Sequence, residues 1–196
     1  MKIAIMGKAG SGKDTIADYM VEKYGYKKVS FAMGLKNVAT GLYFMKGKDR
    51  KLLQDLGTAL RSVRKSVFID YTLSKVEENT VISDLRFEDE YRRLTEEGFF
   101  IIKVEAPTME RLERISKRDG IVIDDEYLKI LSSPIECYLD DENKFFANII
   151  KNDGSIEDLY KKIDSIMPHL DKALEVSLKK QREGLKNDEN KDRASE

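Results

Sequence analysis

The residues whose types and spacing point most directly to chemistry lie in a glycine-rich stretch, Gly7–Thr15, near the start of the chain. Its first seven residues, which end at Lys13, have the pattern G-x-x-x-x-G-K. The stretch lies between an apolar run and an amphipathic segment. Such a pattern between a strand and a helix is typical of a phosphate-binding loop, because glycines let successive backbone N–H groups turn toward an anion. The helix N-terminus adds unpaired N–H donors, and the lysine supplies a mobile charge for the outer phosphates.

We therefore expect this loop to bind the phosphates of a nucleoside triphosphate. The alternative interpretation is a glycine-rich turn that does not bind phosphate. The residues expected to bind the nucleotide are Ala9, Gly10, Ser11, Gly12, Lys13, Asp14 and Thr15.

Asp14 departs from the usual pattern of such loops, which place Ser or Thr directly after the lysine as a magnesium ligand. Here the hydroxyl comes one residue later, at Thr15. A carboxylate beside triphosphate oxygens would repel them unless a cation lay between, so we expect Asp14 to face magnesium or its water shell. In the alternative interpretation the side chain turns away and complements the positive N-terminus of the helix.

Asp84 and Arg86 follow a predicted strand, at the edge of the sheet where a phosphate-binding loop also lies. Phosphoryl transfer needs alignment and positive charge more than covalent help from the protein. We expect Asp84 to hold a magnesium-bound water or an acceptor oxygen, and Arg86 to reach the phosphates between two substrates. The alternative is that Asp84 caps the next helix and pairs with Arg86 on the surface.

The stretch 35–78 contains predicted helices and lies between the second and third predicted strands. An insertion at this place overhangs the phosphate edge and is suited to hold a second substrate. Arg61 and Arg64 are candidates for binding the phosphate of that substrate, because the planar guanidinium fork matches phosphate geometry. Lys36 is a further candidate, and a solvated helix end is the alternative for each. Phe31, Phe68 and Tyr71 either stack on an acceptor base or belong to the core.

A lid is predicted over 109–138. Arg111, Arg114 and Arg118 fall on one face of a predicted helix, and a polar loop follows. Such a helix can close over the phosphates and expel water, and we favour Arg114 and Arg118 as the catalytic members. The alternative is a salt-bridged surface helix, since Glu110 and Glu113 stand four residues before Arg114 and Lys117.

The segment Asn152–Gly154 links the last predicted strand to a long helix. In a sheet of this kind that loop lies beside the purine ring of the bound nucleotide, and Asn152 and Gly154 could offer backbone contacts to the base. A plain turn is the alternative.

Apolar runs alternate with helical patterns along the chain, which predicts an α/β fold with a five-stranded, mostly parallel sheet flanked by helices. The predicted strands are Lys2–Met6, Lys27–Ser30, Thr80–Ser83, Phe99–Glu105 and Asn148–Lys151. The predicted helices are Lys13–Tyr24, Leu35–Tyr43, Lys51–Arg61, Ser66–Val76, Phe87–Glu97, Met109–Arg118, Tyr127–Leu131 and Ile156–Met167. The last long helix is expected to open with a capping box of Ser155 and Asp158 and to stop near Pro168.

Composition limits the class of protein. The net charge of −1 argues against a dedicated nucleic-acid binder. The single cysteine and single histidine exclude a disulfide framework and a Cys/His zinc site within one chain. We expect no membrane span and no signal peptide, a cytoplasmic location, and a monomer or homodimer. One domain is predicted over 1–170, followed by a polar tail over 171–196 that is partly helical and then disordered.

Several segments together resemble the deoxynucleoside monophosphate kinases of bacteriophages, which are P-loop kinases. They are Gly7–Thr15, Ser30–Ala32, Leu53–Thr58, Ser83–Glu90, Ser133–Glu136 and Ile150–Gly154. The resemblance covers roughly the first 170 residues, and the D-x-R-F-x-x-E and L-Q-x-L-G-T segments are its most specific parts.

The resemblance implies transfer of a phosphoryl group from ATP, with Mg²⁺, to the 5′-phosphate of a deoxynucleotide, in host cytoplasm if a phage encodes the chain. It implies Lys13 on the donor phosphates, Arg61 and Arg86 near the acceptor phosphate, and Glu136 on the acceptor side or in the lid. Phe68 stands where the family often has Trp, which leaves the base preference open.

Three rival functions remain. They are a kinase for dephospho-coenzyme A or phosphomevalonate, a nucleotide-gated switch, and a non-catalytic nucleotide-binding module. The switch requires an N-K-x-D motif, which the segment Lys151–Gly154 does not provide.

Overall fold

The computed structural model of the chain describes residues 1–47, 49–124, 128, 148–170 and 172. Its centre is a five-stranded sheet in the order β2-β3-β1-β4-β5, and every pairing between these strands is parallel. The strands are β1 (Lys2–Met6), β2 (Lys27–Val29), β3 (Thr80–Leu85), β4 (Phe100–Glu105) and β5 (Ile149–Lys151). The predicted α/β architecture is therefore confirmed, with every strand within a residue or two of its expected place.

Helices cover both faces of the sheet. They are α1 (Lys13–Tyr24), α2 (Phe31–Tyr43), α3 (Arg50–Val63), α4 (Val67–Leu73), α5 (Glu88–Glu96), α6 (Thr108–Asp119) and a C-terminal helix over residues 156–170. Because side chains alternate along a strand, Ile3 and Ile5 of β1 pack against α1 and the C-terminal helix, while Ala4 and Met6 pack toward α4 and α5. In the described part of the chain, no helix is long and apolar enough to cross a membrane.

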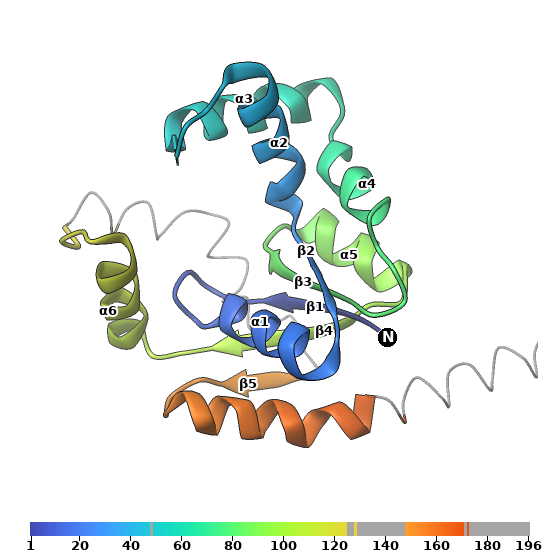
Figure 1. Cartoon of the computed structure of the whole chain (residues 1–196), viewed down its shortest axis with the longest axis vertical. Helices are drawn as coiled ribbons and strands as arrows, with labels where there is room; N and C mark the ends of the chain where they lie inside the picture. Colours follow the sequence, from blue (N-terminus) through green and yellow to red (C-terminus); the bar gives the residue numbers. More distant parts are fainter. Residues whose placement is uncertain (48, 125–127, 129–147, 171, 173–196) are drawn as a thin grey trace, which may run out of the picture.

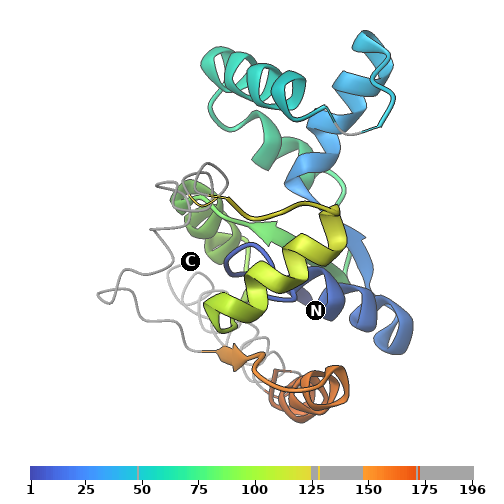
Figure 2. The ribbon, with the colours of Figure 1, turned by 90° about the vertical axis from the view of Figure 1, so that its left-hand side faces the viewer.

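The central strand determines where the glycine-rich loop lies. β1 pairs with β3 on one side and β4 on the other, and its residues 3–6 are fully buried. The loop that follows Met6 therefore leaves the middle of the sheet at its carboxyl edge. Figure 1 shows the insertion of α2, α3 and α4 above that edge, with α6 on another side of the loop, and Figure 2 views the same edge from the front.

Three helix boundaries differ by three or four residues from the sequence-based expectation, and one of them is the end of α4, at Leu73 instead of Val76. α2 begins at Phe31, four residues before its predicted start, because the Asp84 carboxylate accepts hydrogen bonds from the first two N–H groups of the helix. The C-terminal helix passes Pro168 instead of stopping there. Met167 and Leu170 are buried against the core, and this packing holds the last turn in place.

The predicted capping box at the start of the C-terminal helix is confirmed. The Asp158 N–H donates to the Ser155 hydroxyl at 3.1 Å, and the Ser155 N–H donates to the Asp158 carboxylate at 3.3 Å. Residues 125–127 and 129–138 of the lid predicted over 109–138, which include all of the predicted helix Tyr127–Leu131 except Leu128, lie outside the described residues, as does the tail over 171–196 except Lys172.

Candidate active site

The glycine-rich loop is packed so closely that Gly7, Gly10 and Gly12 have no room for a side chain, and a Cβ atom on Gly7 would collide with the carbonyl oxygen of Val104 in β4. Gly10 and Gly12 have φ angles of +77° and +101°, in the left-handed region. A Cβ atom on Gly10 would lie 2.6 Å from the carbonyl oxygen of Arg111, and one on Gly12 would collide with the side-chain amide of Asn152. The glycines in the motif are therefore required by contacts with β4, with α6 and with the loop after β5.

Side chains hold four carbonyl groups of this loop. The Lys13 ammonium, 7% exposed, donates to the carbonyl oxygens of Gly7 at 2.6 Å and Lys8 at 2.9 Å. Arg111 Nη1 donates to the Ala9 carbonyl at 3.1 Å, and Asn152 Nδ2 donates to the Ser11 carbonyl at 2.8 Å. In a trans peptide the N–H points opposite to the C=O, so these contacts fix the directions of the neighbouring amides. Their orientation is thus set before any anion binds.

The functional interest of Arg111 was missed in the sequence. Its helical spacing groups it with the arginines of the predicted lid, and the sequence favours Arg114 and Arg118 over it. In the structure its side chain is buried against the glycine-rich loop. The feature of the sequence that could have identified Arg111 is its position in the first turn of a helix that directly follows a strand of the sheet.

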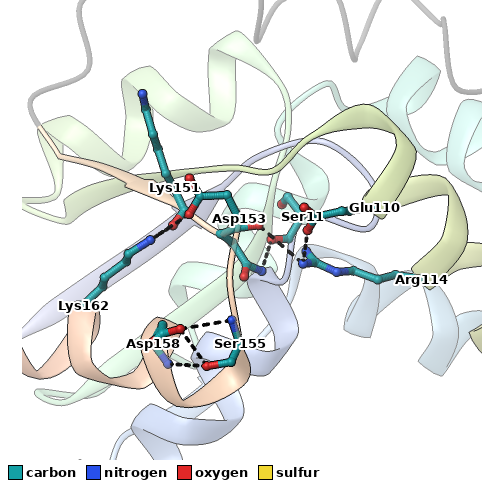
Figure 3. Close-up of polar contacts among 9 residues, drawn as sticks. Ser11, Glu110, Arg114, Lys151, Asp153, Ser155, Asp158 and Lys162 are labelled. Atoms are coloured by element: carbon teal, nitrogen blue, oxygen red, sulfur yellow. Dashed lines mark hydrogen bonds and ion pairs between the residues drawn. The ribbon is translucent and has the colours of Figure 1, made fainter.

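Arg114 and Arg118 have different surroundings. Arg114 Nη2 donates to Glu110 at 2.7 Å and lies 3.4 Å from the Asn152 carbonyl oxygen, as Figure 3 shows in part. Its Nη1 is buried and makes no hydrogen bond in the described part of the chain. Arg118 is exposed and pairs with the adjacent Asp119 through two contacts of 2.9 Å. The structure thus brings Arg114 to the loop after β5, whereas Arg118 pairs with Asp119 at the exposed end of α6.

The loop after β5 is itself well fixed. Asn152 is 6% exposed, and its N–H donates to the Glu105 carbonyl at 2.7 Å. Lys162 donates to the Lys151 carbonyl and to Asp153, and it holds the pKa of the Asp153 carboxyl below its usual value (Figure 3). Gly154 is exposed in this loop. The Asn152 side chain locks the glycine-rich loop, whereas the expected backbone contacts to a base remain a prediction.

Asp14 lies in the first turn of α1 and faces two neighbouring strands. Its Oδ1 accepts from the Ser83 hydroxyl at 2.8 Å and lies 2.9 Å from the Lys28 ammonium. Desolvation alone would raise the pKa of Asp14, but the hydrogen bonds from Lys28 and Ser83 and the charges of Lys28 and Lys13 lower it. Asp14 is therefore an ionised carboxylate in the first turn of α1, next to the end of the glycine-rich loop.

Asp84, at the end of β3, holds the start of the helical insertion. Its two oxygens accept from the N–H groups of Phe31 at 2.9 Å and Ala32 at 3.0 Å. The alternative weighed from sequence, a cap on the helix that follows Asp84, is wrong, because the helix that it caps precedes it in the chain. Sequence spacing could not identify this partner, since the contact depends on the pairing of β3 with β2.

Arg61 is held between two aromatic rings. Its guanidinium carbon lies 4.8 Å from the ring centre of Phe68 and 4.9 Å from that of Phe87. One terminal nitrogen is 3.5 Å from the Gly57 carbonyl oxygen. Phe87 directly follows the exposed Arg86, so the structure brings a side chain of the insertion next to the end of β3. The sequence-predicted pair Arg61 and Arg86 thus comes from segments that meet in space.

Other predicted acceptor residues have different environments. Arg64 forms an ion pair with Asp70 at 2.5 Å within the insertion. Lys36 is exposed on α2. Phe31 is buried in the core between the sheet and the insertion, which supports the core interpretation for that ring. Glu136 lies outside the described residues.

The described residues contain no group of three or more His, Cys, Asp or Glu side chains that could hold a metal ion by themselves. Mg²⁺ needs no such cage, because it binds proteins through one or two carboxylates and takes its other ligands from phosphates and water. The ionised Asp14 carboxylate beside Thr15 fits that donor set.

The order of the parallel strands and the glycine-rich loop after the central strand define a P-loop kinase fold. The chain belongs to the family described as "AAA domain", whose family model matches residues 3–129.

Curated relatives and a solved structure extend this result. The chain is 26% identical over 200 residues to a protein of Acanthamoeba polyphaga mimivirus provisionally named a deoxynucleotide monophosphate kinase, covering 83% of this chain and 94% of the relative. It is 24% identical over 202 residues to a cytidylate kinase of Pyrococcus horikoshii, covering 92% and 95%. The shikimate kinase of Acinetobacter baumannii has the same fold, with a TM-score of 0.58 and 16% identity over 86% of this chain and 93% of that one.

Proposed function

We propose that this protein transfers the γ-phosphoryl group of ATP to the 5′-phosphate of a deoxynucleoside monophosphate, giving ADP and the diphosphate. The observation that carries the proposal is the aromatic clamp on Arg61, which holds a guanidinium of the insertion against Phe87, the residue that follows Arg86 in the turn after β3. The names of the mimivirus and Pyrococcus relatives, both kinases of nucleoside monophosphates, support it. The bacteriophage-type assignment is a finer proposal that rests on the resemblance of the motifs.

The donor site is proposed to be the glycine-rich loop. Its fixed amides and Lys13 bind the triphosphate, and Arg114 is available through its buried Nη1 at the side of the loop after β5. Asn152 and Gly154 would then lie beside the purine, and Arg118 would approach only if α6 moved as part of a lid.

Magnesium is proposed to be held by Asp14, directly or through water, together with the β- and γ-phosphates. Asp84 already uses both oxygens for N–H groups of α2, so a contribution from it needs their remaining lone pairs. When bound, the ion supplies positive charge that neutralises the phosphates.

The acceptor site is proposed to lie between the insertion and the end of β3. Arg61 and Arg86 bind the acceptor phosphate, with Arg64, Lys36 and Glu136 as outer candidates. A pocket of about 450 Å³ lies between α2 and α4, and Phe68 and Tyr71 contribute to its mainly apolar wall. Since Phe68 also touches the Arg61 guanidinium, a base in this pocket would have its phosphate near Arg61.

The reaction itself needs no covalent intermediate on the protein. An oxygen of the acceptor phosphate attacks the γ-phosphorus in line, the bond to the β-γ bridging oxygen breaks, and ADP leaves with that oxygen. Lys13, Arg61 and Arg86 stabilise the charge that migrates between donor and acceptor. Aligned substrates and excluded water make transfer faster than hydrolysis.

A coupled assay with ATP, Mg²⁺ and a panel of acceptors tests the proposal. The panel contains the four deoxynucleoside monophosphates, the ribose counterparts, dephospho-coenzyme A and phosphomevalonate. ADP release that depends on a deoxynucleotide supports the proposal. Release only with dephospho-coenzyme A or phosphomevalonate, slow hydrolysis without an acceptor, or no turnover would each overturn it in favour of the corresponding rival.

A further inference from the structure

Glu90 is a buried carboxyl group to which the proposed function assigns no role. It lies in the first turn of α5 and is 4% exposed. Its Oε2 accepts two hydrogen bonds, from the N–H of Arg86 at 3.0 Å and from the N–H of Phe87 at 3.1 Å. One oxygen therefore fixes two successive peptide groups in the turn between β3 and α5.

That turn carries parts of both proposed acceptor arginines. Arg86 itself projects from it, and the Phe87 ring forms one side of the clamp on Arg61. The other side, Phe68, comes from α4. A shift of the turn would therefore displace the Arg86 side chain and open the Arg61 clamp together.

Capping alone does not account for the burial of Glu90. A capping glutamate on a solvated helix reaches its N–H partner without losing contact with water, whereas burial of a carboxyl group is costly. The charged groups around it have opposite effects, since Asp84 of β3 disfavours the charged form and Arg61 of α3 favours it. On α5 itself the neighbouring Asp89 faces Lys65 at 3.9 Å. The hydrogen bonds that Glu90 accepts therefore explain a buried carboxyl group at this position better than its charge does.

We propose that Glu90 is a positioning residue for the acceptor phosphate, because its carboxyl oxygen holds the turn that presents Arg86 and closes the clamp on Arg61. The inference rests on the proposed function, since it assigns a role within the same acceptor site. It predicts that binding of the acceptor depends on the length of the side chain at position 90 and on its hydrogen-bond acceptor, and not on its negative charge.

Three substitutions separate reach from charge. Glu90→Gln keeps the length and one accepting oxygen but removes the charge. Glu90→Asp keeps the charge but shortens the side chain by one C–C bond, about 1.5 Å, which moves both contacts beyond hydrogen-bond distance. Glu90→Leu removes both properties. Glu96→Gln, on the exposed last turn of α5, is the matched control.

The experiment measures KM for the acceptor and for ATP, kcat, and the melting temperature of each variant. We expect Glu90→Asp and Glu90→Leu to raise the acceptor KM about tenfold, since each loses two hydrogen bonds that hold the turn, with the ATP KM within about twofold. Glu90→Gln and the Glu96→Gln control should stay within about twofold of the wild type in both constants.

The outcomes are distinct. A Glu90→Asp enzyme that behaves as wild type while Glu90→Gln fails would show that charge is the property required, and the inference would be wrong. Equal increases in both KM values would also overturn it. If Glu90→Leu does not fold, the comparison of Gln with Asp decides. If the wild type shows no acceptor-dependent ADP release, the proposed function fails and the inference fails with it. If the wild type is active and the acceptor KM is unchanged in every Glu90 variant, the inference alone is overturned.

Discussion

The donor and acceptor sides of the candidate site are held by different kinds of contact. The glycine-rich loop is fixed by hydrogen bonds to its carbonyl groups from Lys13, Arg111 and Asn152. Arg61 on the acceptor side is held mainly by the faces of Phe68 and Phe87. Hydrogen bonds to the loop define the directions of its amides, whereas aromatic faces position a guanidinium and leave most of its N–H groups available for phosphate oxygens.

This difference has a consequence for mutation. The donor side depends on a short motif that is held by Arg111 of α6 and by Asn152 after β5. In the proposed reaction the Lys13 ammonium takes part in every turnover. The acceptor side depends on the packing of α3, α4 and α5, and damage there should weaken the binding of one substrate more than the chemistry.

The largest effect is expected on the donor side. Lys13→Ala should lower kcat about a thousandfold or more, because the ammonium stabilises charge that develops as the phosphoryl group migrates. The fold should survive, so circular dichroism and melting temperature are measured beside the rate. Lys117→Ala, which removes an exposed lysine paired with Glu113 on α6, is the control. Near-normal turnover of Lys13→Ala would remove the loop from the mechanism.

The second prediction concerns Glu90 and the pH dependence of folding. Burial raises the pKa of Glu90 from its ordinary value of 4.5 to about 7, although the two N–H donors oppose the shift. A carboxyl group with a raised folded-state pKa stabilises the fold fully below its unfolded pKa and loses that contribution as pH rises through the folded value. The difference in unfolding free energy between wild type and Glu90→Gln should therefore fall between about pH 4.5 and 7, by up to about 3 kcal/mol.

Urea denaturation of both proteins at several pH values measures this difference, and comparison with the Gln variant cancels the titration of other groups. A constant difference across the range would show that Glu90 titrates like an exposed glutamate. The result sharpens the contrast between the two sides, since the acceptor turn would contain a buried carboxyl group that titrates near neutral pH, whereas the buried titratable group of the donor loop is the Lys13 ammonium.

The local part of this site could be predicted from the sequence, and the supports could not. The strand, the glycine-rich loop and the helix are adjacent in the chain, so Lys13 and its neighbours could be identified from spacing. The partner of Asp84 depends on which helix starts next to β3, and the role of Arg111 depends on where α6 packs. The burial of Glu90 and the pairing of Arg64 with Asp70 likewise follow from tertiary packing, which a charge pattern alone does not specify.

The third prediction compares two arginines at the end of α3. Arg61→Ala should raise the acceptor KM about tenfold to thirtyfold and change the ATP KM much less, because a guanidinium–phosphate contact is a charge-assisted hydrogen bond. Arg64 is paired with Asp70, so Arg64→Ala should change either constant by no more than about threefold. Steady-state kinetics with each substrate varied in turn makes the measurement. Equal effects of Arg61→Ala on the two KM values would take Arg61 out of the acceptor site.

The smallest expected effect is on magnesium. Asp14→Asn should raise the Mg²⁺ concentration needed for half-maximal rate by about threefold to tenfold, because an ionised carboxylate next to the end of the loop loses its charge. The lowered pKa of Asp14 means that this carboxylate is already charged at neutral pH. The change in Mg²⁺ requirement should therefore be the same in assays at any pH between about 6 and 8.

Asp18→Asn is the matched control for this measurement. Asp18 lies one turn further along α1 and contacts the same Lys28 ammonium, also at 2.9 Å. Both substitutions remove one acid from Lys28, but only Asp14 accepts a hydrogen bond from Ser83 of β3. A shift in Mg²⁺ dependence for Asp14→Asn alone would mean that its position beside the phosphates is what matters. The same shift in both variants would instead trace the effect to Lys28, and Asp14 would then be a partner of that lysine with no part in metal binding.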